Sequence, residues 1–299
     1  MLFWSFWRRR AALALTVLLL AACATPANEA TPSATGQATV DGARIAFARQ
    51  GHAADPGPAV VFQSGMGDDH RSWSAVLQRL PAGLQALAPD RPGYGDSPAR
   101  EGLRDACRIA AEQRALLRST GLRPPYLLVG HSLGGWYQYV YARLYPQEVA
   151  GLVLLDPTHP RLLATLQQRH PAATAVLQLA RHTVFTPTMG QEFDAQSACA
   201  ERVEQQAPLA APALLLASTE RPLYIADDLQ RTLEQLRGDW LQRSGAALVR
   251  VVGSGHQIPS DAPGAVVQAI AQMLLRTNGT SDANDANDAS GAAPAPALL

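Results

Sequence analysis

The sequence predicts an α/β fold, with a mostly parallel sheet of about eight strands flanked by helices. Two observations carry this prediction. Short apolar runs alternate with amphipathic stretches between residues 37 and 276, as a sheet covered by helices on both faces requires. One apolar run, at 126–130, leads into Gly-His-Ser-Leu-Gly at 130–134, a pattern typical of a sharp turn from a strand into a helix.

The individual elements follow from the period of the apolar residues. Strands are expected at 59–63, 84–88, 126–130, 151–156, 213–218 and 247–253. An earlier pair at 37–41 and 43–49 flanks Asp41-Gly42, a dipeptide that favours a tight hairpin turn. Helices are expected at 104–119, 133–144, 227–243 and 264–276.

Two segments depart from this alternation. The interval 157–212 contains leucine-spaced helical stretches and proline-rich polar segments but no convincing strand. We predict that it forms a helical cap over the carboxyl ends of the strands, where open α/β sheets bind ligands. Residues 277–299 repeat Ala-Asn-Asp without apolar periodicity, so they are predicted to be a disordered tail outside the domain of 37–276.

The composition suits one globular domain and excludes several classes of function. Of 299 residues, 47% are hydrophobic and 17% are charged, with a net charge of zero. Because there is no basic field, no nucleic-acid partner is expected. The sequence contains 25 arginines and no lysine. This excludes chemistry that needs a P-loop or Schiff-base lysine.

The N-terminus is predicted to be a targeting segment. Arg8-Arg9-Arg10 precedes an apolar run that is too short to span a membrane but suits a signal peptide at 1–22. Leu20-Ala21-Ala22-Cys23 resembles the lipobox of bacterial lipoproteins, whose cysteine is acylated, although Ala22-Cys23-Ala24 also fits ordinary secretory cleavage. The lipobox predicts an exported protein that faces the periplasm or cell exterior and is anchored to a membrane through Cys23 and a flexible tether at 23–36.

Export would place the other two cysteines in an oxidising compartment. Cys107 and Cys199 are therefore a candidate disulfide pair. Their spacing alone does not establish the geometry that a disulfide needs, so two unpaired thiols are the alternative.

Four short motifs, each placed after a predicted strand, resemble those of the α/β-hydrolase superfamily in its lipase and esterase branch. They are Ser-Gly-Met-Gly at 64–67, where the family usually has His-Gly; the loop from Asp90 to Ser97, similar to its D-x-x-G-x-G-x-S pattern; Gly-His-Ser-Leu-Gly-Gly at 130–135; and Gly-Ser-Gly-His at 253–256. Each motif is weak by itself, but their order and placement match the family. The resemblance implies the α/β-hydrolase fold over 37–276.

The resemblance also implies that Ser132 is a nucleophile and His256 its general base. A serine hydroxyl needs an adjacent base, and an imidazole takes and returns a proton near neutral pH. His256 is the histidine on the loop after the last predicted strand. His131, beside the nucleophile, is predicted to have a packing role, whereas His70 and His159 are predicted to be exposed.

The acid that would complete a triad is left open by the sequence. The family order Ser…Asp/Glu…His places it after the strand that precedes the last one, but here that strand leads into Ser-Thr-Glu-Arg-Pro at 218–222, without the usual Gly-x-x-Asp. Asp156 ends the strand that follows the helix expected at 133–144, where some lipases of this fold carry the acid. Asp156 is favoured, and Glu220, Asp227 and Asp228 are the alternatives.

A tetrahedral intermediate also needs backbone N–H donors. The resemblance places one donor at Leu133, directly after the nucleophile, and the other in the 64–67 loop, at Met66. No cofactor or metal is predicted. Asp68, Asp69 and His70 are adjacent residues, which rarely converge on one ion, and they are interpreted as a solvated loop.

Together these residues predict a serine hydrolase that cleaves a small-molecule carboxylic ester, or an amide or thioester, through an acyl-enzyme on Ser132. A cofactor-free acyltransferase or perhydrolase with the same triad is the alternative. A catalytically silent surface lipoprotein is a third hypothesis, because fold does not determine function. Epoxide-hydrolase and dehalogenase activities are disfavoured, since epoxide hydrolases and dehalogenases of this fold carry Asp at the position that Ser132 occupies here.

Overall fold

The computed structural model describes residues 34–51, 57–220 and 225–289. These residues belong to one compact unit that begins at residue 31. The predicted signal peptide, Cys23 and most of the predicted tether lie outside the described residues. In the part of the chain that is described, no helix is both long and apolar enough to cross a membrane.

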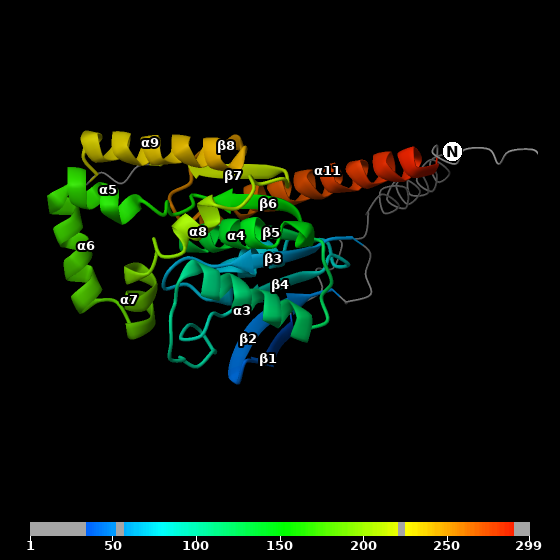
Figure 1. Ribbon diagram of the computed structural model, residues 1–299, viewed down its shortest axis with the longest axis horizontal. Helices are drawn as coiled ribbons and strands as arrows, with labels where there is room; N and C mark the ends of the chain where they lie inside the picture. The colour runs from blue at the N-terminus through cyan, green and yellow to red at the C-terminus, as the bar shows by residue number, and fades with distance from the viewer. Residues whose placement is uncertain (1–33, 52–56, 221–224, 290–299) are drawn as a thin grey trace, which may run out of the picture. The chain divides into compact units, whose positions relative to one another are not determined.

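An eight-stranded sheet forms the centre of this unit (Figure 1). Its strands are β1 (Ala34–Val40), β2 (Ala43–Gln50), β3 (Ala59–Gln63), β4 (Ala86–Pro89), β5 (Tyr126–His131), β6 (Val149–Leu155), β7 (Ala213–Ser218) and β8 (Ala247–Val251). They lie in the order β1-β2-β4-β3-β5-β6-β7-β8. Only the β1–β2 and β2–β4 pairs are antiparallel. The predicted α/β fold with a mostly parallel sheet is confirmed.

The central strands are apolar on both faces because helices cover both faces. Every residue of β3 and β5 is buried. Successive side chains of a strand point to opposite faces, so Leu128 packs in one core cluster while Leu127 and Val129 pack in the other. The first cluster includes α3 (Ala106–Ser119), α4 (Leu133–Leu144) and Trp240 of α9 (Asp227–Ser244). The second includes α2 (Ser74–Leu77), α10 (Ile258–Asp261) and α11 (Pro263–Ala289).

Two predicted boundaries are wrong, and each has a physical reason. Strand β1 begins at Ala34, inside the predicted tether, because its backbone pairs with β2 and Gly36 lies opposite Phe47. Helix α11 continues to Ala289, so residues 277–289 are not the disordered tail that was predicted. Once the first turns of a helix are packed against a core, each added residue gains a hydrogen bond without a new nucleation step. Residues 290–299 lie outside the described residues.

Four helices lie between β6 and β7, in the interval where a cap is predicted. They are α5 (Leu162–Arg169), α6 (Pro171–Thr183), α7 (Pro187–Asp194) and α8 (Ala200–Glu204). Residues 157–212 are all described and contain no strand. Helices α5, α6 and α7 lie together on the side of the sheet away from the far end of α11 (Figure 1).

A disulfide joins this insertion to the rest of the domain. Cys107 lies in the first turn of α3, and Cys199 immediately precedes α8. Their sulfurs are bonded and their Cα atoms lie 5.8 Å apart. Both side chains pack against the core cluster that contains α3 and α4. The bond therefore holds the end of the insertion against α3.

Candidate active site

Ser132 occupies the turn between β5 and α4 in a conformation that L-residues rarely adopt. Its φ is 53° and its ψ is −121°, a strained backbone geometry that persists only where the surroundings hold it. A Cβ at Gly130 would lie 2.5 Å from the carbonyl oxygen of Gly134, and a Cβ at Gly134 would overlap the carbonyl groups of Gln63 and Ser64. Both glycines are therefore needed for the turn that presents the Ser132 hydroxyl.

Ser132, Asp156 and His256 follow the carboxyl ends of β5, β6 and β8, respectively, and their side chains lie close together. The Ser132 Oγ lies 3.1 Å from the Nε2 of His256. On the other side of the imidazole, Nδ1 lies 3.6 Å from the Oδ2 of Asp156. The structure thus brings together the serine, the histidine and the carboxylate that the sequence favours.

Contacts from the loop after β7 and from helix α10 hold the segment that carries His256. The backbone N–H groups of Thr219 and Glu220 donate to the carbonyl oxygen of Ser254 at 3.1 and 3.0 Å. The N–H of Gly255 donates to the Oδ2 of Asp261, in α10, at 3.0 Å. His256 itself keeps a side chain that is 55% exposed, so its ring remains accessible to a substrate.

Asp156 is held as a carboxylate by the groups around it. Burial raises its pKa, but this effect is outweighed by His256 and by the backbone N–H of Ser218, with a further contribution from the charge of Arg237, so that the pKa lies below its usual value. Ser218 donates to Oδ1 at 3.2 Å, and Arg237 lies 3.6 Å from the same oxygen. An ionised carboxylate at this place stabilises a positive charge on the neighbouring imidazole.

The alternative acids have other surroundings. Glu220 is exposed, and its backbone N–H supports the His256 segment. Asp228 lies 3.5 Å from His170. Asp227 begins α9 beside it. The sequence could not separate these residues from Asp156 because the distance of each from His256 depends on how the strands are ordered in the sheet.

The 64–67 loop passes directly beside Ser132. A Cβ at Gly65 would lie 3.3 Å from the Cβ of Ser132 and 3.2 Å from the Nδ1 of His131, so only glycine fits there without displacement. Met66 follows Gly65, and Leu133 begins α4 directly after Ser132. The first N–H groups of a helix have no partner within it and attract negative charge, which favours an anion beside Leu133.

Two clusters of described residues have the composition of a metal site; one contains the disulfide-bonded Cys107 and Cys199, and the other lies beside the 90–97 loop. A carboxylate oxygen from each of Asp69 and Asp90 lies near a ring nitrogen of His70. Asp90 already accepts hydrogen bonds from the His70 ring at 2.8 Å and from the backbone N–H groups of His70 and Asp96. These hydrogen bonds hold the 90–97 loop in place, and this structural role accounts for the cluster of Asp69, His70 and Asp90. His70 is buried in it, which contradicts the predicted exposure.

Comparison with known proteins identifies the family. A family model described as "Alpha/beta hydrolase family" matches residues 60–269. The chain belongs to this family. The protein YqjL of Bacillus subtilis is 26% identical over 237 residues, which are 78% of this chain and 88% of YqjL.

Two further similarities extend the comparison of this alpha/beta hydrolase. The pimeloyl-[acyl-carrier protein] methyl ester esterase of Aromatoleum aromaticum is 38% identical over 98 residues, which are 33% of this chain and 36% of the esterase. The structure of epoxide hydrolase CorEH aligns with a TM-score of 0.61 and 18% identity, covering 81% of this chain and 99% of that one. YqjL is matched along most of its length, whereas the esterase is matched over about a third of its length.

His131 is the second histidine at the site of this alpha/beta hydrolase, and it differs from His256 in its surroundings. It is 1% exposed, and its Nε2 lies 2.8 Å from the backbone carbonyl oxygen of His256. Burial, followed by the charge of His256, lowers its pKa to about 4. The neutral ring therefore donates its Nε2 proton to that carbonyl. His131 supports the His256 backbone, which agrees with the predicted packing role.

We expect His131 to make the folded state sensitive to acid. Its pKa is about 4 in the folded state and 6.5 when unperturbed, so the unfolded chain binds more protons between these values and stability falls as pH drops through this window. Between pH 7 and pH 5 the unfolding free energy of the wild type should therefore fall by about 2 kcal/mol more than that of His131→Gln. Urea denaturation at the two pH values measures both.

The exposed His182 gives the matched control, because His182→Gln should leave the pH dependence of the wild type unchanged. The groups that face His131 are His256, Asp156 and Asp68, whose carboxylate lies 3.8 Å from its Nδ1. If His131→Gln keeps the full wild-type difference between the two pH values, His131 does not titrate in this window.

Several residues at the site were missed or misplaced by sequence reasoning. Thr158, three residues after β6, places its Oγ1 3.3 Å from the Ser132 Oγ and donates its backbone N–H to the Ser132 carbonyl at 2.9 Å. His159 is buried against Asp239 at 2.6 Å, although exposure was predicted. Arg91, in the 90–97 loop, contacts the Glu192 carboxylate and the carbonyl oxygens of the 64–67 loop, and the local sequence gives no signal for these contacts.

Proposed function

We propose that this alpha/beta hydrolase cleaves a carboxylic ester through an acyl-enzyme on Ser132. The observation that carries the proposal is the 3.1 Å distance from the Ser132 Oγ to the Nε2 of His256, with Asp156 on the far side of the ring. This arrangement supplies a nucleophile, a base within hydrogen-bonding reach and an orienting anion. The partial similarity to a methyl ester esterase supports an ester as the substrate class.

Acylation begins when the Ser132 oxygen attacks the ester carbonyl carbon while its proton passes to the Nε2 of His256. The carbonyl oxygen becomes an oxyanion and accepts hydrogen bonds from the N–H groups of Leu133 and Met66. Asp156 stabilises the imidazolium. When the tetrahedral intermediate collapses, the bond to the alcohol oxygen breaks and the imidazolium gives its proton to the leaving alcohol.

Deacylation repeats these steps with water as the nucleophile. His256 takes a proton from water, the resulting hydroxide attacks the acyl carbon, and a second tetrahedral intermediate collapses to the carboxylic acid. The proton then returns to the Ser132 oxygen, which restores the free enzyme. An added alcohol that reached the same position would yield a new ester, so hydrolysis and acyl transfer share the first half-reaction.

The proposal is tested with p-nitrophenyl esters of increasing acyl length and a fluorophosphonate probe. Hydrolysis of at least one ester and covalent labelling of the folded protein are expected. Faster release of p-nitrophenol on addition of an alcohol, with the alcohol ester as product, would assign an acyltransferase instead. A folded protein that neither turns over an ester nor reacts with the probe would contradict the proposal.

We also propose that the protein is exported and anchored through an acylated Cys23. The support is the apolar run after Arg8-Arg9-Arg10 and the lipobox that ends at Cys23. Expression in a bacterial host with a palmitate analogue should label the wild type but not Cys23→Ser. Labelling of both proteins, or of neither while the chain is exported, would contradict lipidation at Cys23.

A further inference from the structure

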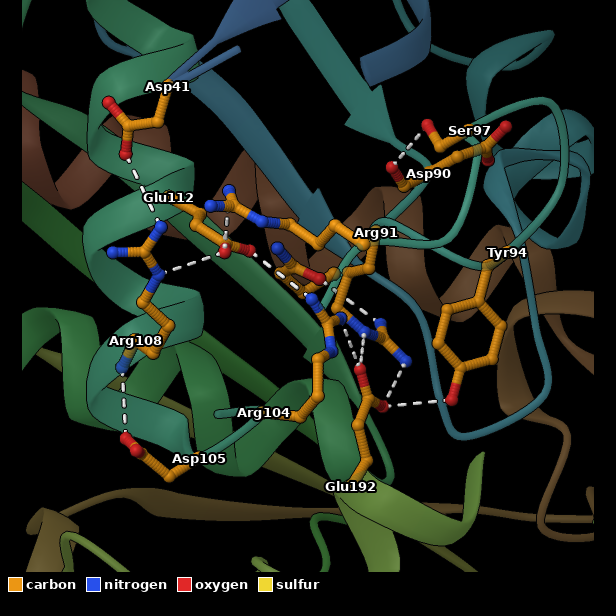
Figure 2. A network of polar contacts seen from close by, with 12 residues as sticks. Asp41, Asp90, Arg91, Tyr94, Ser97, Arg104, Asp105, Arg108, Glu112 and Glu192 are labelled. Atoms are coloured by element: carbon orange, nitrogen blue, oxygen red, sulfur yellow. Dashed lines mark hydrogen bonds and ion pairs between the residues drawn. The ribbon is translucent and has the colours of Figure 1, made fainter. Parts of the chain in front are cut away.

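A buried carboxylate of the insertion, Glu192, lies at the centre of an ion-pair network close to the nucleophile. Glu192 is on α7 and is 0% exposed. Its Oε1 accepts hydrogen bonds from Arg104 at 2.7 Å and from the Nε of Arg91 at 3.1 Å. Its Oε2 accepts from the Nη2 of Arg91 at 3.1 Å and from the hydroxyl of Tyr94 at 2.9 Å (Figure 2). Four donors thus converge on one carboxylate.

The same arginine contacts the loop beside the nucleophile. The Nη1 of Arg91 donates to the carbonyl oxygen of Ser64 at 2.7 Å, and its Nη2 donates to the carbonyl oxygen of Gly65 at 2.8 Å. Arg91 is 4% exposed, so these bonds form out of contact with solvent. One planar guanidinium therefore joins a carboxylate of the insertion to two successive peptide groups of the 64–67 loop.

The bond to the Gly65 carbonyl sets the direction of one specific N–H group. The peptide unit that contains the Gly65 carbonyl also contains the Met66 N–H, and a trans peptide is planar with the two groups pointing in opposite directions. A guanidinium that holds the Gly65 oxygen therefore points the Met66 N–H away from Arg91. Rotation of this peptide would require breaking a buried, charge-assisted hydrogen bond.

The buried charges of Arg91 and Glu192 stabilise each other. Burial lowers the pKa of Arg91, but the Glu192 carboxylate, together with Tyr94 and Tyr137, raises it above its usual value, and the arginine remains charged. Burial raises the pKa of Glu192, but Arg91 and Arg104 hold it below its usual value. Removing one partner of such a pair leaves an uncompensated charge in the interior, which is strongly unfavourable.

Helix α7 is also packed against the 64–67 loop and against the 90–97 loop, which carries Arg91. A Cβ at Gly67 would lie 3.3 Å from the Cε of Met189, and a Cβ at Gly93 would overlap Thr188. The disulfide between Cys107 and Cys199 holds the chain after α7 against α3. These contacts of α7 and the disulfide that follows it hold Glu192 in place.

We propose that Glu192 and Arg91 are positioning residues, through which helix α7 orients the Met66 N–H toward the oxyanion of the reaction. The inference rests on the proposed acyl-enzyme function, in which Met66 stabilises a tetrahedral intermediate. It assigns the insertion a role in the chemical step in addition to any contact with substrate. The expected signature is a loss of transition-state stabilisation with little change in ground-state binding.

The test measures ester hydrolysis and inhibition by a boronic acid, which forms a tetrahedral adduct with a serine nucleophile. Glu192→Gln is expected to lower kcat on the order of 10²-fold, the size of the effect of losing one oxyanion donor, and to weaken boronate inhibition by a similar factor. KM should stay within about threefold of the wild-type value.

Glu112→Gln is the matched control. Glu112 is a buried carboxylate of the same network that pairs with Arg100, Arg104 and Arg108, but it makes no contact with Arg91 in the described network. This variant should lower the melting temperature and leave the boronate affinity unchanged. If Glu192→Gln behaves in the same way, the loss at Glu192 is purely structural and the inference is wrong.

A double variant keeps the inference testable if Glu192→Gln does not fold. Arg91→Met with Glu192→Met removes both buried charges together, which folded proteins commonly tolerate. It should fold, keep its KM and show the same loss in kcat and boronate affinity, whereas wild-type values would overturn the inference. A wild type that lacks ester turnover and probe labelling would instead contradict the proposed function itself, so the two failures are distinguishable.

Discussion

Ser132→Ala is expected to lower kcat for ester hydrolysis on the order of 10⁶-fold and to abolish labelling by a fluorophosphonate. The alanine variant has no atom that can attack the carbonyl carbon, and His256 then has no hydroxyl from which to take a proton. The remaining activity would come from the N–H donors and from water bound beside His256. Steady-state kinetics and gel detection of the labelled protein measure both effects.

The substitution should leave the fold intact. Ser132 has a φ of 53°, and alanine experiences the same backbone strain as serine, so the melting temperature should not fall. Ser260→Ala is the matched control, because Ser260 is an exposed serine close in sequence to His256 whose hydroxyl donates to the Gln257 carbonyl. An alanine variant at 132 that is folded and still labelled would place the nucleophile elsewhere.

Asp156→Asn is expected to lower the acylation rate on the order of 10⁴-fold. A carboxylate accepts the proton on Nδ1 of His256 and leaves Nε2 free to receive the proton of Ser132. An asparagine amide can donate to Nδ1 instead, which favours the tautomer with its proton on Nε2 and removes the base. The pre-steady-state burst of p-nitrophenol measures the acylation step directly.

Two variants at the alternative acids complete this experiment. Glu220→Gln and Asp228→Asn should keep the acylation rate within about threefold of the wild-type value, because neither carboxylate lies beside the imidazole in the manner of Asp156. A rate that survives Asp156→Asn and is lost in Glu220→Gln would reverse the assignment. Urea denaturation of each variant separates a loss of catalysis from a loss of folding.

Both large effects depend on a pair of strained turns at the ends of neighbouring strands. Ser132 has a φ of 53° and Asp156 a φ of 38°, although neither is glycine. Backbone strain of this kind concentrates at functional sites, where the surrounding structure holds it in place. Here the Ser132 N–H donates to the Leu155 carbonyl at 2.9 Å, and the Asp156 N–H donates to the Leu216 carbonyl at 2.9 Å. The sheet thereby holds both turns.

Much of the fold was predictable because its signals are local. The apolar runs predicted all eight strands, and Asp41-Gly42 predicted the hairpin that joins β1 and β2. The predicted boundaries of α4 agree with the structure at both ends, because the turn at Ser132 begins the helix and the apolar pattern stops where the helix ends. The extension of α11 was missed because apolar periodicity detects only the part of a helix that packs on a core.

By itself, the sequence determined the parallel α/β architecture, the serine turn with its two glycines, and the histidine after the last strand. Each of these is written in a few consecutive residues, because sterics and apolar periodicity act over short stretches of chain. Only the tertiary structure placed Asp156 beside His256, since that distance depends on the order β6-β7-β8 in the sheet. It alone also joined Arg91 to Glu192, because a buried ion pair between a loop and a distant helix leaves no periodic signal in either segment.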